Sequence, residues 1–320
     1  MNAPMVTVAI PFFNNQVTIA YAIESVLAQT FTDFELLLVN DGSADGSVEA
    51  VRPYVDGQRV RLFNDGRNLG LSARLNQIAQ LANGAFLARM DADDVMHPAR
   101  IEKQIRFLTC HLDIDVLGTD IYLVDSTYRV IERRRTPAKA LSKRFTYLRL
   151  FHPTITGRTT WFRDNPYSAE FPRCEDLDLW MRTGGGLNIS FIPEPLLYYN
   201  RFGTRNVSKI ASSLRDHRRV LTKYRSKIGL RSYLLGMSKS IVGTMVYRIV
   251  GVAPILWNAF PQSAIPKVEL ASAQGLLDSI VFHAKTRIPS LPNSGTLCTV
   301  PSGPRVIAER GAEIRSRACP

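Results

Sequence analysis

Short apolar runs alternate with helical segments over the first 110 residues, and this alternation limits the fold more than any other feature of the chain. Each apolar run has the length of a strand, and the segments between the runs repeat apolar residues at helical spacing. Such alternation is typical of a parallel sheet covered by helices on both faces and joined by right-handed crossovers. The predicted strands are 6–12, 34–39, 60–63 and 86–90, and the predicted helices are 17–29, 45–55, 71–83 and 98–110.

The second half of the chain continues with strands and helices in a less regular order. The segment from His152 to Phe171 is rich in loop-forming residues, and three consecutive glycines, Gly184–Gly186, are expected to end the helix that precedes them. The patterns predict strands over 116–124, 129–133, 189–192 and 196–199, and helices near 139–151, over 174–182 and over 208–228.

Polar residues stand where the predicted parallel strands of the first half end. Ligands of open α/β sheets bind outside the carboxyl ends of the strands, so four separate loops are expected to converge on one pocket. The residues at these ends are Pro11, Asn14, Asp41, Asn68 and the stretch Asp91–Asp93.

The stretch Phe86–Asp94 is an apolar run that stops in three carboxylates. Oxygen ligands at such a place suit Mg²⁺ or Mn²⁺ carrying a substrate phosphate. A second interpretation is equally open on the local pattern: Asp94 caps the helix that begins near Pro98, and the other acids are solvated loop residues. The convergence of several strand ends favours the metal site.

A second acidic pair, Glu175 and Asp176, opens the predicted helix over 174–182. Acids in a first helical turn are favoured by the helix dipole, so this pair needs no chemical role to be explained. Trp180 in the same helix has the spacing from Leu177 and Met181 that core packing requires.

The positive charge of the chain lies in its second part. Residues 1–130 hold 10 Lys and Arg against 16 Asp and Glu, whereas residues 131–320 hold 30 against 12. The basic cluster over 215–231 could face substrate phosphates or an anionic membrane, or it could be a solvated helix face. We expect no nucleic-acid partner, because aromatic residues are not interleaved with the basic ones and no binding module is recognisable.

Residues 233–260 are largely apolar but are interrupted by Lys239, Arg248 and Pro254. This pattern is a poor membrane span, and it leaves an interfacial helix and ordinary packing equally open. The four cysteines have no metal-ligand spacing, and the N-terminal residues lack a secretory signal, so a reducing, cytoplasmic location is expected, with peripheral membrane contact on the inner face as an option.

Several motifs together resemble those of the inverting family 2 glycosyltransferases, over about residues 5–208. They occur in the family's order, and each of them alone is a weak signal. They are Val8–Asn14, Ser25–Phe31, Asn40-Asp41-Gly42-Ser43, Asn68-Leu69-Gly70, the DxD motif Asp91-Ala92-Asp93-Asp94, His152-Pro153-Thr154 and Glu175–Trp180.

The resemblance implies the GT-A fold, a Rossmann-like nucleotide-diphospho-sugar transferase architecture. This is an α/β fold with a mixed, mostly parallel sheet flanked by helices, here with a helical C-terminal extension. The implied catalytic domain covers residues 1–207, with a nucleotide-binding half (1–110) and an acceptor half (111–207). A basic and apolar helical extension follows over 208–260, and a partly disordered tail over 261–320.

The resemblance also implies a role for each site residue. Asp41 accepts a hydrogen bond from uracil, Pro11, Asn14 and Asn68 line the nucleoside, and Asp91 lies near the ribose and the metal. Asp93 holds Mg²⁺ or Mn²⁺ on the diphosphate. Asp176 is the implied general base, with Glu175 as the second choice. His152 and Trp180 are candidate acceptor contacts.

The implied activity is the transfer of a sugar, with inversion, from a nucleotide-diphosphate sugar, most simply a UDP-sugar, to a glycan or lipid-linked saccharide. The alternative is a non-catalytic sugar-nucleotide-binding or scaffold protein of the same fold. Two family features are absent. No His follows Tyr198-Tyr199-Asn200-Arg201, which leaves the third metal ligand open, and no Gln-x-x-Arg-Trp motif of processive synthases occurs, which favours single transfer.

Overall fold

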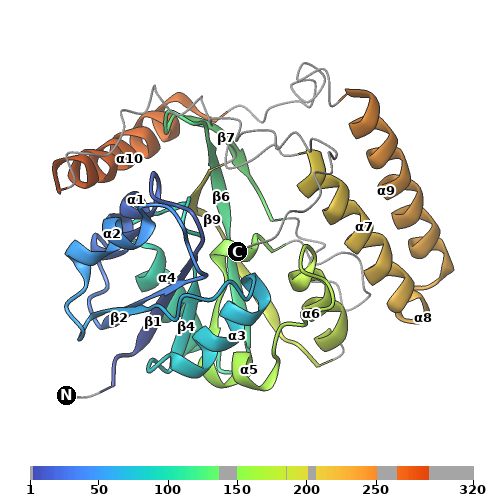
Figure 1. Ribbon diagram of the computed structural model, residues 1–320, viewed down its shortest axis with the longest axis horizontal. Coiled ribbons are helices and arrows are strands. Elements are labelled where there is room, and N and C mark those ends of the chain that lie inside the picture. Colours follow the sequence, from blue (N-terminus) through green and yellow to red (C-terminus); the bar gives the residue numbers. More distant parts are fainter. Residues whose placement is uncertain (1–2, 137–149, 185, 201–206, 251–264, 288–320) are drawn as a thin grey trace, which may run out of the picture.

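One mixed sheet forms the centre of the molecule (Figure 1). The computed structural model describes residues 3–136, 150–184, 186–200, 207–250 and 265–287. Within these residues nine strands are arranged in the order β3-β2-β1-β4-β8-β6-β9-β5, and β7 pairs with β6. The strands are β1 (Val6–Phe12), β2 (Phe34–Asn40), β3 (Val60–Phe63), β4 (Phe86–Arg89), β5 (Val95–Met96), β6 (Val116–Val124), β7 (Val130–Arg134), β8 (Thr156–Arg158) and β9 (Ile189–Asn200).

The first four strands are parallel, as the sequence predicts. Val6 of β1 lies opposite Phe34 of β2 and Phe86 of β4, so the three strands start level and run the same way. Their carboxyl ends therefore meet at one edge of the sheet, which confirms the expected α/β fold and places the polar strand ends together.

Helices cover both faces of this half of the sheet. Side chains of a strand alternate between faces, so Val8 and Leu36 pack with α1 and α4, while Ala9 and Leu37 pack with α3 and α6. The helices of the first 200 residues are α1 (Ile19–Leu27), α2 (Ser47–Val51), the 3₁₀ turn η1 (Arg52–Tyr54), α3 (Leu71–Leu81), α4 (Arg100–Cys110), the 3₁₀ turn η3 (His152–Thr154), α5 (Thr159–Asp164) and α6 (Glu175–Thr183).

The region from His152 to Phe171, expected to be rich in loops, also holds a central strand and a helix. β8 lies between β4 and β6 and is antiparallel to both. It has only three residues, too few for a periodic pattern, and its place is fixed by packing. A side chain at Gly157 would put a Cβ 2.5 Å from the Asp115 carbonyl oxygen, so glycine is required there.

The two late strands predicted over 189–192 and 196–199 are one strand, β9. Pro193 and Pro195 interrupt the pattern but not the strand, because the pairing with β6 shifts register between Thr119 and Asp120. The Pro193 carbonyl instead accepts a hydrogen bond from Arg133 Nη2 (2.9 Å).

Strand β2 was expected to be wholly apolar, but it contains a buried carboxylate. Glu35 accepts hydrogen bonds from Thr7 Oγ1 (2.6 Å), the Asn83 backbone N–H (2.7 Å) and Arg61 Nη1 (2.8 Å). Burial alone would raise the pKa of Glu35, but these donors outweigh it and lower the pKa. Glu35 thus joins β1, β2, β3 and the turn before β4 at the edge opposite to the polar strand ends.

A helix, α10 (Lys267–Arg287), lies within the segment expected to be a partly disordered tail. It packs along α1 and β7, and its Glu269 accepts hydrogen bonds from Tyr122 Oη (2.9 Å) and Arg133 Nη1 (3.1 Å). The remainder of the predicted tail and the helix predicted near 139–151 lie outside the described residues.

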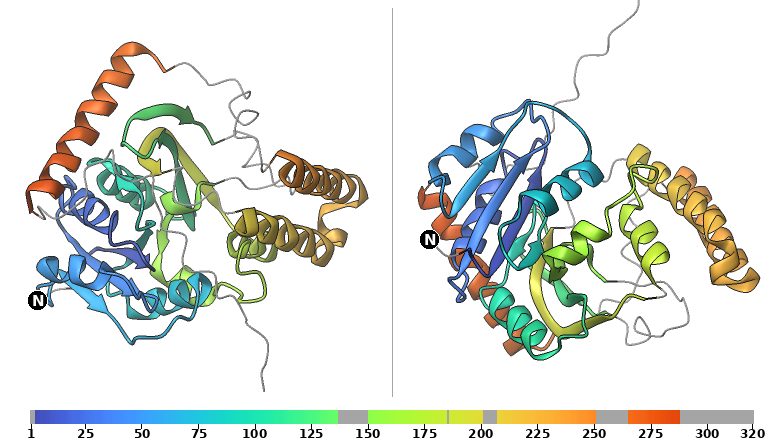
Figure 2. Two further views of the ribbon diagram at one scale, coloured as in Figure 1. Left: turned by 45° about the horizontal axis from the view of Figure 1, so that its top comes forward. Right: turned by 90° about the horizontal axis from the view of Figure 1, so that it is seen from below.

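The basic segment predicted as one helix over 208–228 is split at Tyr224 into α7 (Val207–Lys223) and α8 (Arg225–Ile228). The chain then returns along α7 as α9 (Leu230–Val250), and both helices lie at the edge of the molecule (Figure 2). The rest of the predicted apolar pair, beyond Val250, lies outside the described residues.

The helix pair is attached to the rest of the molecule through Asp178 of α6. This side chain is fully buried and accepts hydrogen bonds from Tyr224 Oη (2.9 Å) and Lys223 Nζ (3.2 Å). A buried carboxylate requires such donors, so α6 and the end of α7 are held in fixed positions relative to each other.

Candidate active site

Three loops meet at the ends of β1 and β2. Asn14 adopts a left-handed backbone conformation (φ 54°), donates its N–H to Ser43 Oγ (3.0 Å) and accepts the Ala44 N–H on Oδ1 (2.9 Å). Asn68 Nδ2 donates to the Asp41 carbonyl (2.9 Å). Pro11 is buried near the end of β1, past the last residue paired with β4. The structure therefore brings Pro11, Asn14, Asp41 and Asn68 to one corner, as the sequence predicts.

Asp41 organises this corner. Its Oδ1 accepts from the Leu69 N–H (2.7 Å) and Arg74 Nε (3.0 Å), and its Oδ2 accepts from the Gly70 N–H (3.1 Å). A carboxylate oxygen has two lone pairs, so Oδ2 keeps room for one further donor. The neighbouring Gly42 has φ 72°, and a Cβ there would lie 2.8 Å from the backbone of Arg67, which explains the glycine in the Asn-Asp-Gly-Ser turn.

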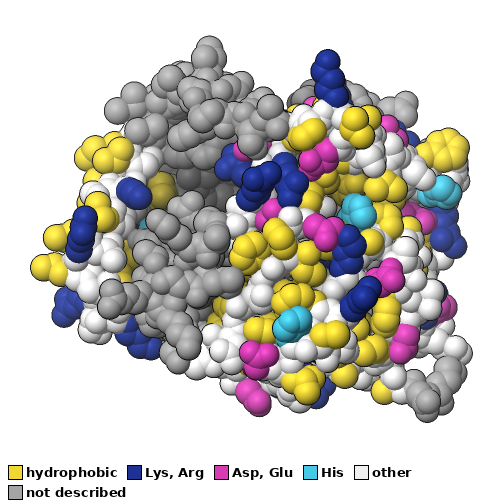
Figure 3. All heavy atoms as spheres, turned by 180° about the vertical axis from the view of Figure 1, so that it is seen from behind, with side chains coloured by type: hydrophobic (Ala, Val, Ile, Leu, Met, Phe, Trp, Pro, Cys, Tyr) yellow, Lys and Arg dark blue, Asp and Glu magenta, His cyan; other side chains and the backbone are white. Residues whose placement is uncertain are grey.

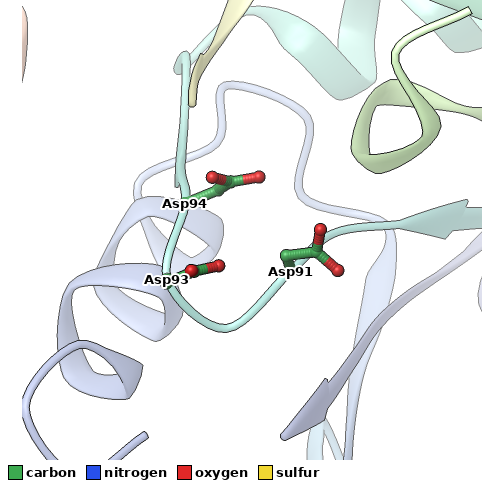
Figure 4. Close-up of side chains that lie close together, drawn as sticks. All are labelled: Asp91, Asp93 and Asp94. Carbon is green, nitrogen blue, oxygen red and sulfur yellow. The ribbon is translucent and has the colours of Figure 1, made fainter. Parts of the chain in front are cut away.

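Asp91, Asp93 and Asp94 lie around one point after β4 (Figure 4). One carboxylate oxygen from each lies within 4.8 Å of the others. Asp91 and Asp93 are half-buried, whereas Asp94 is fully buried. We refer to these three residues as the acidic triad.

Asp94 does not cap the helix α4, as one interpretation of the sequence held. That helix begins at Arg100, and Asp94 Oδ1 accepts the N–H of Asn200 in β9 (2.9 Å). Its Oδ2 is buried and has no hydrogen-bond donor. Burial, followed by the charges of Asp93 and Asp91, raises the pKa of Asp94 well above its ordinary value.

The triad fits a hard divalent cation. It offers carboxylate oxygens of the type that Mg²⁺ and Mn²⁺ prefer, close enough together to share one ion. Asp94 Oδ2 is buried without a donor, which is energetically unfavourable. A cation bound next to this oxygen would offset that cost.

Arg89 in β4, to which the sequence patterns assigned no role, lies beside the triad. The residue is 4 % exposed, and its Nη2 is 2.5 Å from Asp91 Oδ1. Its Nε and Nη1 are buried without an acceptor. Burial would lower the pKa of Arg89, but the charges of Asp91, Tyr167 and Glu175 outweigh burial and raise the pKa. The signal in the sequence that could have indicated this role is a charged residue within an apolar strand.

A second buried arginine supports the first. Arg100 Nη2 donates to the Arg89 carbonyl (2.8 Å), and Arg100 Nε donates to Gln104 Oε1 (3.0 Å). Burial lowers the pKa of Arg100 to about 9, against the opposing charge of Asp94. Both arginines thus compensate part of the negative charge that the acids bring to this edge of the sheet.

Glu175 and Asp176 stand at the start of α6. Glu175 is buried, and burial together with the charge of Asp176 raises its pKa to about 7. Burial also raises the pKa of Asp176, whose Oδ1 accepts the Leu177 N–H (2.7 Å). The charge of Asp91 acts on both side chains, and so does that of Arg89. The structure therefore brings this pair to the same site as the triad.

His152 lies behind Glu175. Its Nδ1 is 3.9 Å from Glu175 Oε1, and its Nε2 is 2.9 Å from Tyr167 Oη. Burial, with the charge of Arg89, lowers the pKa of His152 well below its ordinary value, so the imidazole is neutral. His152 is itself buried next to Glu175, and its contact with an acceptor stays a prediction.

Trp180 belongs to the core. It is 2 % exposed, and its ring is stacked 6.3 Å from that of Trp161. The acceptor contact expected for Trp180 is therefore wrong, because a ring that supports a sugar needs an accessible face.

The model of the family described as glycosyl transferase family 2 matches residues 7–168. The putative glycosyltransferase EpsE of Bacillus subtilis is 33% identical over 190 residues, which are 57% of this chain and 67% of EpsE. WfgD of Escherichia coli, a UDP-Glc:α-D-GlcNAc-diphosphoundecaprenol β-1,3-glucosyltransferase, is 29% identical over 197 residues, 60% of this chain and 74% of WfgD. The mannosyltransferase PcManGT from Pyrobaculum calidifontis, solved with GDP-Man and Mn²⁺, has a similar fold, with a TM-score of 0.55, 12% identity, and coverage of 91% of this chain and 89% of that one.

Proposed function

We propose that this chain, which belongs to glycosyl transferase family 2 and is a glycosyltransferase, transfers a sugar with inversion from a UDP-sugar to a lipid-linked saccharide. The observation that carries this proposal is that two acidic clusters act on one buried arginine, Arg89. The acidic triad follows β4, and Glu175 and Asp176 open α6.

The nucleotide is assigned to the corner formed by Pro11, Asn14, Asp41 and Asn68. The free lone pair on Asp41 Oδ2 supports a contact with a ring N–H such as that of uracil. The fold also accepts a purine nucleotide, since PcManGT was solved with GDP-Man. The fold therefore does not determine which nucleotide base is bound, and we assign that choice to this corner.

Asp93 and Asp91 are the proposed metal ligands, and Asp94 supplies a further carboxylate behind them. A bound Mg²⁺ or Mn²⁺ contributes a Lewis acid and a template for the departing diphosphate. Arg89 holds the Asp91 carboxylate in place from inside the sheet.

Asp176 is the proposed general base. Inversion requires the acceptor hydroxyl to attack from the side opposite the leaving diphosphate, while a carboxylate removes its proton. The raised pKa of Asp176 makes it a better base than an ordinary aspartate. Glu175, whose pKa is about 7, is the second candidate for this role.

The lipid-linked acceptor is supported by the relative WfgD, whose acceptor is a diphosphoundecaprenol-linked sugar. It is also supported by the basic helix pair α7–α9, which Asp178 and Tyr224 join to the helix that carries Asp176. We therefore place the protein on the inner face of a membrane, in peripheral contact with it.

The test is a thermal-shift panel of UDP-, GDP- and dTDP-sugars with and without Mn²⁺, followed by a turnover assay with the donor that binds. A ligand at about 100 times its Kd adds roughly 2.7 kcal/mol to the free energy of unfolding, which is readily measured. We expect UDP-sugars to stabilise the protein only with Mn²⁺. If only GDP-sugars stabilise the protein, Asp41 does not bind uracil. Binding without any turnover would favour a non-catalytic sugar-nucleotide-binding protein.

A further inference from the structure

The helix α9 carries a band of exposed apolar side chains on its outer face. Six large apolar side chains there are between 42% and 72% exposed. Their positions recur at intervals that keep them on one side of a helix. We call them the α9 stripe: Leu230, Leu234, Leu235, Ile241, Val242 and Met245.

The opposite face of α9 is already occupied by α7. Ser240 is buried there and donates to the Leu214 carbonyl (3.1 Å), while Arg218 donates to Thr244 Oγ1 (2.9 Å). Gly243 lies against the Leu214 side chain. Large apolar side chains exposed together on the face opposite a packed face normally mark a further contact surface. Among the described residues no element covers the α9 stripe, so an external surface is the expected partner.

The positive charge of the helix pair α7–α9 indicates that the surface on which the α9 stripe lies is anionic. Residues 207–250 contain ten Lys and Arg and a single acid, Asp216. Asp216 is buried and pairs with Arg219 at 3.1 Å. Exposed basic side chains include Arg225, Lys227, Arg231 and Lys239, and the last two lie on α9 itself. In Figure 3 the left edge of the molecule shows hydrophobic and basic side chains without acidic ones.

We infer that the α9 stripe docks on an anionic lipid surface, with α9 lying in the plane of the interface. None of the helices in the described part of the chain is long and apolar enough to cross a membrane, so this is contact with the surface and not a span. The apolar side chains enter the acyl boundary, and Arg231 and Lys239 reach lipid phosphates at its edge.

Docking would also orient the proposed active site. Tyr224, between α7 and α8, is bonded to Asp178, and Asp178 lies two residues after Asp176 in α6. A bilayer under α9 therefore lies at a fixed position relative to the proposed base. This inference deepens the proposed function by giving its lipid-linked acceptor a surface, but vesicle binding can be measured without any turnover.

The experiment is vesicle flotation of the full chain. Vesicles of phosphatidylcholine containing a third of phosphatidylglycerol are compared with vesicles of phosphatidylcholine alone. The double variant Leu235→Glu/Val242→Glu places two carboxylates in the stripe, and Leu112→Glu changes a leucine that is 75% exposed elsewhere on the surface. Circular dichroism and thermal unfolding confirm that the variants are folded, and thermal shift with donor and Mn²⁺ reports the nucleotide site separately.

We expect the wild type and Leu112→Glu to float with the anionic vesicles, and the double variant to partition about tenfold less. Binding should weaken as salt is raised and should be weaker still on neutral vesicles. Equal flotation of the double variant, no flotation of the wild type, or equal binding to neutral vesicles would overturn the inference. So would a wild-type dimer that the double variant converts to a monomer, since the stripe would then bind a second copy of the chain. If a variant or the wild type gives one of these results but still binds the donor, only the membrane inference fails, and the proposed function stands.

Discussion

Arg89 Nη2 lies 2.5 Å from Asp91 Oδ1, so the strand that delivers the acidic triad also carries the counter-charge of its first member. The guanidinium is buried, and its charge acts on Glu175 as well as on Asp91. One side chain is thus in electrostatic contact with the proposed metal site and with the proposed base.

The first prediction concerns Arg89. Arg89→Met should lower sugar transfer by about a hundredfold, because it removes a preorganised charge from the site. Arg89→Lys should recover only part of the loss, since a lysine lacks the planar fork. Initial rates at saturating Mn²⁺ measure the effect, with exposed Arg106→Met as the matched control and thermal unfolding as the check of the fold. Near-normal rates in Arg89→Met would show that the ion pair with Asp91 is only structural.

The second prediction concerns the metal. Asp93→Asn should abolish transfer and leave the fold intact, because the amide keeps the shape but loses the charge. Mn²⁺ binding, measured by electron paramagnetic resonance with UDP present, should be lost in Asp93→Asn. It should be retained in Asp45→Asn, a change in a loop of the nucleotide corner that is outside the triad. Unchanged Mn²⁺ binding in Asp93→Asn would show that Asp93 is not a metal ligand.

The third prediction separates Asp176 from Glu175. Asp176→Asn should lose at least about a hundredfold in transfer, and Glu175→Gln should lose less. A carboxylate acts as a base only when it is ionised, and burial raises the pKa of both groups, that of Glu175 to about 7. The wild-type rate should therefore fall at a higher pH than it would with an ordinary aspartate as the base. Glu175→Gln should move this fall to lower pH, because it removes the neighbouring negative charge that disfavours ionisation of Asp176. The reverse order of losses would assign the base to Glu175.

The fourth prediction concerns stability. The pKa of Glu35 is lowered in the folded protein, because its hydrogen bonds outweigh burial. Its contribution is therefore present above the ordinary value of 4.5 and is lost as the pH falls through the folded pKa. Glu35→Gln should cost about 2 kcal/mol in the free energy of unfolding at pH 7 and less at pH 3. Urea unfolding measures this, with exposed Glu194→Gln expected to change little. An equal cost at both pH values would contradict the assigned role.

The parallel half of the fold could be predicted because each strand there is a separate apolar run. Val6–Phe12 and Phe34–Asn40 are visible in the sequence, and their parallel order follows from the helices between them. β8 was missed because three residues carry no period, and tertiary packing decides its place. No helix was predicted over 267–287, although the residues that α10 buries, Ala273, Leu277, Ile280 and Ala284, recur there at helical spacing.

The candidate site was predicted where a motif ends a strand or starts a helix. Asp41, the acidic triad and Glu175 were found in this way. Arg89 was not found, because a single arginine in an apolar strand departs from the strand pattern without indicating which acid it pairs with. Trp180 was left between a core role and an acceptor contact, because a tryptophan on a helix fits both in sequence, and its burial favours the core.

The central claim is a metal-assisted, inverting transfer with Asp176 as the base. Its most direct test is ¹H NMR of the sugar first released when the protein hydrolyses its α-linked UDP-sugar donor in the presence of Mn²⁺. The account predicts that the β-anomer appears first in the wild type and that release is lost in Asp176→Asn. Release of the α-anomer first, or an unchanged rate in Asp176→Asn, would contradict it.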